Sequence, residues 1–296
     1  MDLDTSNKEF INLLKTAGLP PENAAFFPVS GGDINDSYRA ETGIGTYFVK
    51  TNSGISDRFF SSEAEGLAFL AKEGGANVPN VIGTAYAGGR GVLVLEWIEG
   101  GKVGRTGEKL GEMLARVHSN TKHKKFGYPH ATYIGTLEQQ NGLWLSWTDY
   151  YREQRLIPQL NIGTHSGIIT AERQKKIEQL TARLDQWLPQ RPEVSILHGD
   201  LWSGNWMNGS DGSPWLVDPS VLYGHREMDL AFTELFGGFP GGFYEAYGHH
   251  LPLDADYGER KPLYQLFYLL VHLNFFGEQY GKPVDRILDY YISAKD

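Results

Sequence analysis

The sequence predicts an α+β fold with two lobes: a small lobe of antiparallel strands with one main helix, and a larger, mostly α-helical lobe. Strand-like segments and one long helical segment dominate the first 98 residues, whereas apolar residues at helical spacing dominate from residue 110 onward. Between these regions Glu99-Gly100-Gly101 interrupts the pattern, and we place a hinge there. The expected domains are residues 1–96 and 97–296.

The predicted small lobe opens with a short amphipathic helix. Ser6 to Glu9 has the spacing of a capping box, and Gly18 ends the apolar pattern that follows. Residues 24–50 then contain two or three strand-like segments, with a turn of small residues at 30–35. Antiparallel pairing of these strands is therefore expected.

A helix and a buried strand complete this lobe. Apolar residues at helical spacing predict a helix over residues 59–73, which Gly74-Gly75 ends. The run from Gly91 to Ile98 is typical of a buried strand. Beyond the hinge, the predicted helical segments of the large lobe are residues 110–117, 143–156, 177–188 and 263–280.

Composition excludes several classes of function. The 296 residues carry a net charge of −9, so a broad basic surface for nucleic acid or anionic membrane is not expected. The apolar run at 263–276 is too short and too polar to span a membrane. The chain has no cysteine and its N-terminus lacks the pattern of a signal peptide, which predicts a cytoplasmic protein. The sequence leaves the oligomeric state open.

The segment from His198 to Asn205, His-Gly-Asp-Leu-Trp-Ser-Gly-Asn, carries the most specific signal. Sites that transfer a phosphoryl group to a hydroxyl use a loop aspartate as proton acceptor, an asparagine five residues later as a metal ligand, and another aspartate beyond a short hairpin. Asp200, Asn205 and Asp218 match these positions. Such residues also suit ordinary surface turns, so the prediction depends on the whole pattern.

A hairpin is expected inside this motif. Turn-forming residues fill positions 208–214, and short apolar segments flank them. Two short strands joined by this turn would bring Asp218 back beside Asn205. The sequence therefore predicts a kinase-type active site with a nucleotide and a divalent metal ion.

Lys50 is the expected phosphate anchor because it ends an apolar strand upstream of the loop, as a lysine that reaches the α- and β-phosphates should. The alternative is a solvated lysine at a strand end. Either Glu63 or Glu65 on the following helix could pair with it. We favour Glu63, which shares a helical face with the apolar residues directed at the sheet.

Other candidates surround this framework. Gly31, Gly32 and Asn35 lie in the turn upstream of Lys50, which either lines the nucleotide phosphates with its N–H groups or is a plain hairpin. At the hinge, the backbone of Glu96 and Ile98 is expected to hold adenine.

The acceptor is expected near Trp202, whose ring offers a flat face for a sugar or a cationic amine. His225 and Arg226 follow Asp218 closely in Tyr-Gly-His-Arg-Glu. We expect them to border the acceptor, although His225 could equally be a packing residue.

With these residues assembled, the sequence resembles the fructosamine kinase (ketosamine-3-kinase) family of the aminoglycoside-phosphotransferase-like kinases. The resemblance extends over nearly the whole chain and rests on His198–Asn205, on Asp218-Pro219 followed by Tyr223–Glu227, and on Leu235–Phe239. It implies a bilobal protein-kinase-like fold.

The resemblance also implies a reaction: ATP-dependent phosphorylation of the 3-hydroxyl of a ketosamine, such as a fructosamine or ribulosamine, which leads to deglycation. It implies that Asp200 is the base and that Lys50 and Glu63 form the phosphate-anchoring pair. Asn205 and Asp218 would hold Mg²⁺. The partner would be a small-molecule ketosamine or another glycated amine.

Two rival functions remain open at this point. A phosphotransferase of the same fold could act on an aminoglycoside, on choline or on a related amine. A catalytically silent pseudokinase could bind nucleotide as an interaction module, although Lys50, Asp200, Asn205 and Asp218 are all present.

Overall fold

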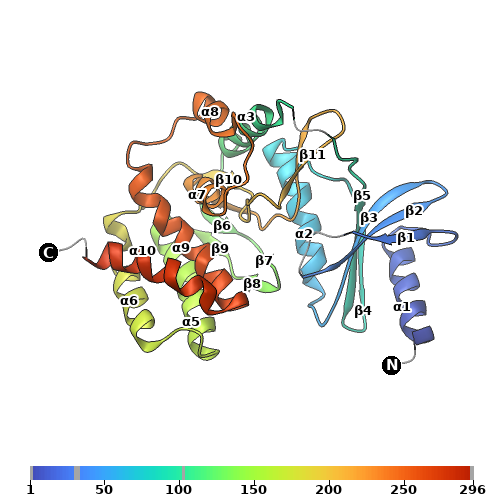
Figure 1. Cartoon of the computed structure of the whole chain (residues 1–296), viewed down its shortest axis with the longest axis horizontal. Helices are drawn as coiled ribbons and strands as arrows, with labels where there is room; N and C mark the ends of the chain where they lie inside the picture. Colours follow the sequence, from blue (N-terminus) through green and yellow to red (C-terminus); the bar gives the residue numbers. More distant parts are fainter. Residues whose placement is uncertain (1–2, 30–33, 102–103, 294–296) are drawn as a thin grey trace.

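The structure, a computed structural model, describes residues 3–29, 34–101 and 104–293, with only the backbone path for residues 3–7. Two lobes lie side by side (Figure 1). An antiparallel sheet dominates the N-terminal lobe, and helices dominate the C-terminal lobe. The predicted two-lobed α+β architecture is confirmed.

The N-lobe is a five-stranded antiparallel sheet in the order β1-β2-β3-β5-β4. Helix α1 (Leu3–Thr16) covers one face, and helix α2 (Arg58–Phe69) covers the face turned toward the C-lobe (Figure 1). The strands are β1 (Ala25–Pro28), β2 (Asp36–Thr42), β3 (Gly45–Ser53), β4 (Val81–Ala87) and β5 (Arg90–Glu96).

The alternation of side chains along β3 and β5 explains the direction of Lys50. Val49 pairs with Val94, and both belong to the apolar cluster under α1. Lys50 pairs with Leu93, which packs in the cluster under α2. Because successive residues of a strand point to opposite faces, Lys50 is directed toward α2 and the C-lobe.

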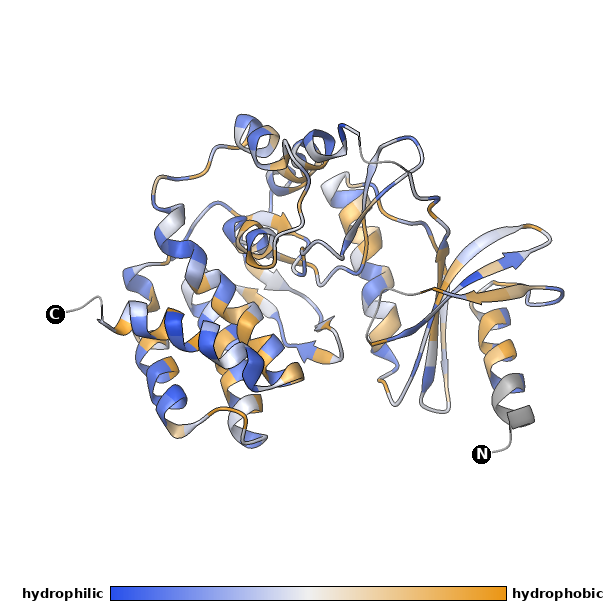
Figure 2. Ribbon diagram, in the orientation of Figure 1, coloured by the Kyte–Doolittle hydropathy of each residue, from blue (hydrophilic) through white to orange (hydrophobic). Residues whose placement is uncertain are grey.

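The C-lobe contains eight α-helices among the described residues, with their apolar sides packed together (Figure 2). Its largest cluster is built mainly from α4, α6, α7, α9 and α10. The helices are α3 (Thr106–Ser119), α4 (Trp147–Tyr151), α5 (Ile157–His165), α6 (Ala171–Thr181), α7 (Glu227–Leu235), α8 (Phe243–His250), α9 (Tyr257–Phe276) and α10 (Gly281–Ser293).

Short strands carry the loops of this lobe. A four-stranded sheet has the order β10-β13-β6-β9, and two separate hairpins pair β7 with β8 and β11 with β12. The bounds are β6 (Phe126–Tyr128), β7 (Thr132–Ile134), β8 (Leu137–Gln139), β9 (Gly142–Trp144), β10 (Ser195–Leu197), β11 (Trp206–Asn208), β12 (Pro214–Leu216) and β13 (Leu222–Gly224).

A shared apolar cluster joins the lobes. Phe60 and Leu67 of α2 lie in the same cluster as Leu110 of α3 and Leu216 of β12. A Cβ atom at Gly66 would lie 3.1 Å from the Pro219 side chain, so the glycine allows α2 to approach the segment after Asp218 closely. The position of α2 is therefore tied to both sides of the site.

Several predicted helices differ in extent from the observed ones. In the segment predicted as helical at 143–156, residues 143 and 144 belong to strand β9 and helix α4 begins at Trp147, and the helix predicted at 263–280 is α9, from Tyr257 to Phe276. Helix α1 begins at Leu3, ahead of the capping box expected at Ser6 to Glu9. Helix α6 ends at Thr181, and residues 184–186 form a separate 3₁₀ turn instead of continuing one helix to 188. The apolar pattern misled the prediction because Leu184 and Leu188 bury in the same cluster as α6.

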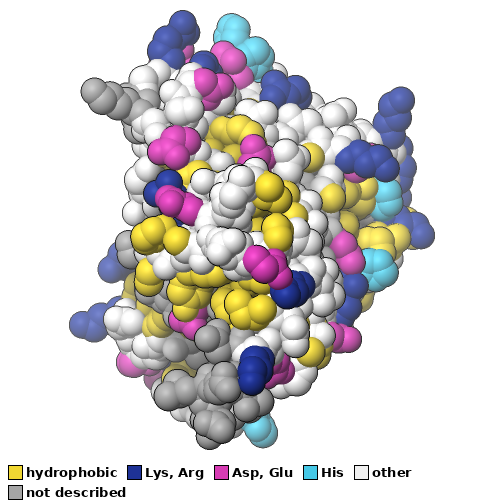
Figure 3. Space-filling model, turned by 90° about the vertical axis from the view of Figure 1, so that its right-hand side faces the viewer, with side chains coloured by type: hydrophobic (Ala, Val, Ile, Leu, Met, Phe, Trp, Pro, Cys, Tyr) yellow, Lys and Arg dark blue, Asp and Glu magenta, His cyan; other side chains and the backbone are white. Residues whose placement is uncertain are grey.

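The surface of the N-lobe end shows acidic, basic and apolar side chains interspersed (Figure 3). Its exposed large apolar side chains include Phe27, Ile44 and Ile82. In the described part of the chain, the helices lack the combination of length and apolar character that a membrane span needs.

Candidate active site

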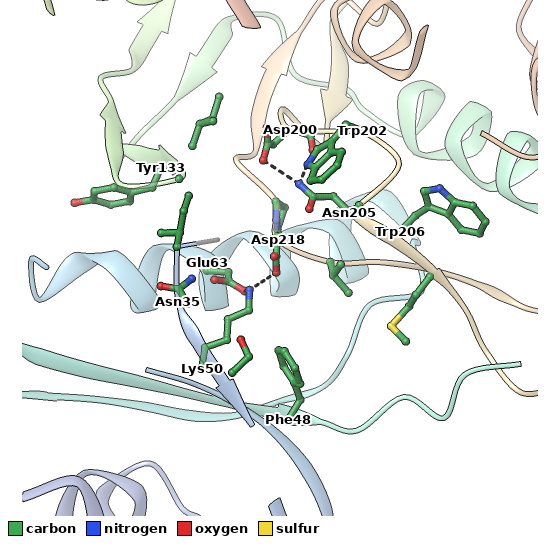
Figure 4. A pocket seen from close by; sticks show the side chains of 18 of the residues that line it. Asn35, Phe48, Lys50, Glu63, Tyr133, Asp200, Trp202, Asn205, Trp206 and Asp218 are labelled. Atoms are coloured by element: carbon green, nitrogen blue, oxygen red, sulfur yellow. Dashed lines mark hydrogen bonds and ion pairs between the residues drawn. The ribbon is translucent and has the colours of Figure 1, made fainter. Parts of the chain in front are cut away.

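A cavity of about 930 Å³ lies between the lobes, and it contains the residues of the sequence motif. Asp200, Asn205 and Asp218 line it from the C-lobe, while Lys50 and Glu63 line it from the N-lobe. In Figure 4 the first three side chains face the same space, opposite the lysine and the glutamate. The structure thus brings together five residues that are up to 168 positions apart in the chain.

A buried carboxylate, that of Asp229, holds the loop that carries Asp200. Asp229, near the start of α7, accepts hydrogen bonds from the backbone N–H groups of His198 (2.7 Å) and Gly199 (2.9 Å). It also contacts His118 Nε2 at 3.2 Å. Tyr268 of α9 donates its hydroxyl to the carbonyl of Gly199 at 2.9 Å. These bonds are shielded from water, so their loss would leave buried polar groups without partners.

His198 is a structural part of this loop. Burial lowers the pKa of its imidazole, so the ring is neutral near pH 7. In the tautomer that satisfies both contacts, Nε2–H donates to the carbonyl of Val217 (2.9 Å) and Nδ1 accepts from the N–H of Asp200 (3.2 Å). The imidazole therefore links Val217, which precedes Asp218, to the backbone of Asp200.

Asn205 is oriented by Asp200. Its Nδ2 group donates to the Asp200 carbonyl (2.8 Å) and to Asp200 Oδ2 (2.9 Å). Both amide hydrogens have partners, which leaves Oδ1 as the atom suited to a cation. Together with the carboxylate of Asp218, it supplies the hard oxygen ligands that Mg²⁺ prefers. These residues fit a magnesium ion.

The predicted hairpin returns the chain to this point. β11 pairs antiparallel with β12, and the N–H of Val217 donates to the carbonyl of Asn205 at 3.0 Å. Asp218 has a φ of 55°, a left-handed conformation that aspartate tolerates better than most residues. Its carboxylate contacts the ammonium group of Lys50 across the lobes.

Lys50 binds two carboxylates at once. Its Nζ lies 2.7 Å from Oε1 of Glu63, and it also contacts Asp218. Glu65 is directed elsewhere and forms a two-pronged ion pair with Arg58 at the surface, with both N–O distances 2.9 Å. Of the two glutamates considered from the sequence, Glu63 is the one that the structure places beside Lys50.

The electrostatics of the two aspartates differ. Burial raises the pKa of Asp200 to about 8, and the negative charge of Asp218 adds to the effect, whereas the hydrogen bond from Asn205 opposes it. Burial also opposes ionisation of Asp218, but the Lys50 ammonium outweighs burial and lowers the pKa of Asp218 below its usual value. One carboxyl therefore holds a proton readily, while the other stays charged.

The Lys50 pair shows the same balance. Burial disfavours the charged ammonium, but attraction to Asp218 and Glu63 prevails and raises the pKa of Lys50. Burial raises the pKa of Glu63 to about 7, which the attraction of Lys50 offsets only in part. Lys50 thus carries a permanent positive charge into the cavity.

The end of the cavity next to the hinge, where adenine was predicted, is lined by both polar and apolar side chains. Glu96 and Ile98 line it, together with side chains such as Phe48 and Leu95. Asn35 also lines the cavity, and Asn52 Nδ2 donates to its Oδ1 at 2.9 Å. Gly31 and Gly32 lie outside the described residues.

The residues predicted to border the acceptor are only partly found in the cavity. Trp202 lines the cavity, but His225 and Arg226 are not among its described lining residues. His225 is buried, with Nδ1 2.7 Å from the hydroxyl of Tyr264. Arg226 donates to the carbonyls of Leu251 (2.9 Å) and Pro252 (2.6 Å). Their proximity to Asp218 in sequence was misleading, because β13 carries the chain away from the cavity before they occur.

Two sets of site residues were not predicted from the sequence. One is Asp229, whose fully buried carboxyl group requires partners. The other is a set of aromatic residues just after α7 and around the end of α9, which line the cavity. The spacing of His272 and Phe276, four apart on one helix, was a usable signal. The missed aromatic lining residues include Phe236, His272, Phe276 and Tyr280.

A proton-accepting carboxyl and an ion-paired lysine that face each other across two lobes define a class of enzyme, the kinase-like phosphotransferases. Comparison with known proteins identifies the family within this class. The fructosamine kinase family model matches residues 7–294, and the chain belongs to this family. The predicted ATP-dependent phosphotransferase with an alcohol group as acceptor is thereby confirmed.

Curated relatives agree with this assignment. A probable ketoamine kinase of Enterococcus faecium is 38% identical over 268 residues, covering 90% of this chain and 95% of the relative. A probable ketoamine kinase of Lactiplantibacillus plantarum is 39% identical over 265 residues, covering 89% and 93%.

Solved structures confirm the kinase-like fold. A fructosamine-3-kinase candidate from Haemophilus somnus superposes with a TM-score of 0.83 at 29% identity, covering 94% of this chain and 96% of that one. The amicoumacin kinase hAmiN, in complex with AMP-PNP and Ca²⁺, has a TM-score of 0.64 at 16% identity, covering 100% and 94%. The second likeness shows the fold alone.

Proposed function

We propose that this enzyme transfers the γ-phosphoryl group of ATP to the 3-hydroxyl of a ketosamine, the sugar adduct of an amine. The observation that carries the proposal is the convergence of Asp200, Asn205 and Asp218 with Lys50 in one cavity. Membership of the fructosamine kinase family supports the choice of acceptor. Phosphorylation at this position would make the sugar prone to leave, which regenerates the amine.

Asp200 is the proposed proton acceptor. As the hydroxyl oxygen bonds to the γ-phosphorus, the bond from that phosphorus to the ADP oxygen breaks, and the hydroxyl proton passes to a carboxylate oxygen of Asp200. A pKa of about 8 suits this role, because a base is most effective when its pKa lies near the working pH. Asn205 keeps the carboxylate oriented through its two hydrogen bonds.

The remaining residues position the donor. Lys50, held by Glu63, would contact the α- and β-phosphates. Oδ1 of Asn205 and the carboxylate of Asp218 would hold Mg²⁺, which when bound neutralises charge on the phosphates. Because Asp218 contacts Lys50 directly, entry of the phosphates between them would loosen that ion pair.

The remaining roles are divided between the two lobes. We assign residues 1–96 as the nucleotide-binding lobe and residues 97–296 as the catalytic and substrate lobe. The backbone of Glu96 and Ile98 would hold adenine, and the turn with Gly31, Gly32 and Asn35 would line the phosphates. Trp202 would offer its ring to the sugar. Because ATP is the phosphate donor, we place this reaction in the cytoplasm.

The test is ADP release by the purified protein with Mg²⁺-ATP and a panel of acceptors: fructosyl-lysine, ribulosyl-lysine, free sugars, choline and aminoglycosides. We expect turnover with the ketosamines and a product that carries phosphate on the 3-oxygen by phosphorus and proton NMR. Turnover on aminoglycosides or choline alone would favour the rival phosphotransferase. Nucleotide binding without turnover on any acceptor would favour the pseudokinase.

A further inference from the structure

The acceptor end of the cavity has a wall of aromatic rings, which we call the aromatic wall: Phe236 after α7, His272 and Phe276 at the end of α9, and Tyr280 in the 3₁₀ turn that follows. The rings form one contiguous group. The centroid of His272 lies 4.9 Å from that of Phe236, 5.7 Å from that of Phe276 and 5.1 Å from that of Tyr280. A ligand in the cavity therefore meets several aromatic faces together.

This wall is close to the proposed catalytic loop. The ring of Phe232, one helical turn before Phe236, stacks on Tyr268 at 3.6 Å, and Tyr268 holds the carbonyl of Gly199. In Figure 1 the C-terminal end of α9 lies near the β7–β8 hairpin, on the side of the C-lobe that faces α2. A sugar with its hydroxyl at Asp200 would thus present its substituent to these rings.

The wall is open to a ligand. Phe236 is 42% exposed and Phe276 is 46% exposed, and Trp202 across the loop is 38% exposed. Large aromatic side chains are commonly covered in a soluble protein. Three such rings that line one cavity are suited to contact with an apolar or cationic group.

Carboxyl groups outnumber basic groups around the cavity. Asp200, Asp218, Glu63 and Glu96 line it, and Lys50 is the one Lys or Arg among its described lining residues. That ammonium is already shared by Glu63 and Asp218. His272 is not a substitute, because burial lowers the pKa of its imidazole, and the carbonyl of Tyr268, 2.8 Å from Nδ1, offsets this effect only in part. A second anionic group on the acceptor would therefore lack a described cationic partner.

We propose that the aromatic wall binds the amine part of the ketosamine and selects adducts whose nitrogen carries an aromatic or apolar substituent without a carboxylate. The inference rests on the proposed function. The protonated nitrogen of such a substrate gains from the negative faces of the rings, and its substituent buries against them. A carboxylate beside the nitrogen would meet those same faces and the acidic side chains, which disfavours adducts of free α-amino acids.

A matched pair of substrates tests this selection. The fructosyl adducts of 2-phenylethylamine and of phenylalanine differ only by the carboxylate. We expect the KM of the phenylethylamine adduct to be lower by about tenfold or more, with a smaller difference in kcat. Equal KM values, or a lower value for the phenylalanine adduct, would overturn the inference while leaving the proposed function intact. Turnover with neither these nor any other ketosamine would instead overturn the proposed function, and this inference with it.

Two variants locate the effect. Phe276→Ala should raise the KM of the phenylethylamine adduct about threefold to tenfold and leave the KM of ATP unchanged. The matched control is Tyr290→Ala, an aromatic residue on α10 that is 50% exposed and is not among the described residues lining the cavity. It should change neither constant. If Phe276→Ala lowers the melting temperature, Phe236→Ala replaces it, and unchanged kinetics in the folded variant would contradict the proposal.

Discussion

The two sides of the cavity hold their functional groups with different interactions. On the C-lobe side, the loop of Asp200 donates buried hydrogen bonds to Asp229 and accepts one from Tyr268, and such bonds are short-ranged and directional. On the N-lobe side, Lys50 reaches the same space through ion pairs with Glu63 and Asp218. The proposed proton acceptor is therefore fixed by directional bonds, whereas the proposed phosphate anchor is held by ion pairs that can rearrange.

The largest effect should come from substituting the two aspartates of the C-lobe side one at a time. Asp200→Asn should reduce kcat by about 10³-fold, because the amide cannot accept the hydroxyl proton, while ATP binding stays nearly intact. Asp218→Asn should weaken Mg²⁺-nucleotide binding as well. Turnover kinetics and calorimetric ATP binding check both variants, and equal, mild effects would contradict the assigned roles.

Removing the Asp229 carboxylate removes the buried hydrogen bonds that hold the Asp200 loop on the C-lobe side. Asp229→Ala leaves two buried backbone N–H groups and His118 without their partner, so we expect a loss of about 3 kcal/mol in the free energy of unfolding. Urea denaturation measures it. The control is Asp211→Ala in the exposed β11–β12 turn, which should cost less than about 1 kcal/mol. Similar losses in the two variants would show that the buried hydrogen bonds of Asp229 contribute no more to stability than those of an exposed turn.

Acid should also destabilise the C-lobe, because it contains a buried histidine. Burial, with the nearby positive charges of Arg260 and Arg226, lowers the pKa of His225 to about 3. In the unfolded chain this imidazole takes up a proton below its ordinary pKa of about 6.5, whereas in the folded protein it stays neutral. Stability that is present above this pH is therefore lost as the pH falls below it.

For His225 we expect a loss of about 2 kcal/mol between pH 7 and pH 5. The measurement is the free energy of unfolding at both pH values for the wild type and for His225→Gln. Glutamine does not titrate, so the variant should lose less stability on acidification. The same pH dependence in both proteins would assign the effect to other groups.

The smallest effect should come from the N-lobe side. Glu63→Gln weakens the hold on Lys50 without removing the lysine, and we expect kcat/KM for ATP to fall about tenfold. Glu65→Gln is the matched control on the same helix, and its exposed pair with Arg58 should matter little. If the two variants behave alike, Lys50 does not depend on Glu63.

Much of the site could be predicted because its residues follow local rules. The hairpin between Asn205 and Asp218 was encoded by turn-forming residues, and the structure contains it as β11 and β12. The preference for Glu63 over Glu65 followed from helical spacing alone. Both predictions needed only contacts within an element or between neighbouring elements.

Other parts of the site could not be predicted this way. His225 and Arg226 were expected at the acceptor because they follow Asp218 closely, but the chain direction after β13 buries one and ties the other to the carbonyls of Leu251 and Pro252. The aromatic wall joins Phe236 to side chains from 36 to 44 residues later. No local pattern brings such segments together.

The sequence alone determined the two-lobed architecture, the chemistry of the Asp200 loop and the family, because turn formers, apolar periodicity and motif spacing act over a few residues. Only the tertiary structure decided which partners these residues meet. The packing of α7 and α9 placed Asp229 under the loop and the aromatic wall at its end, and the docking of the lobes set Lys50 between two carboxylates. Burial and neighbouring charge then fixed which carboxyl holds a proton, and neither is a property of the linear chain.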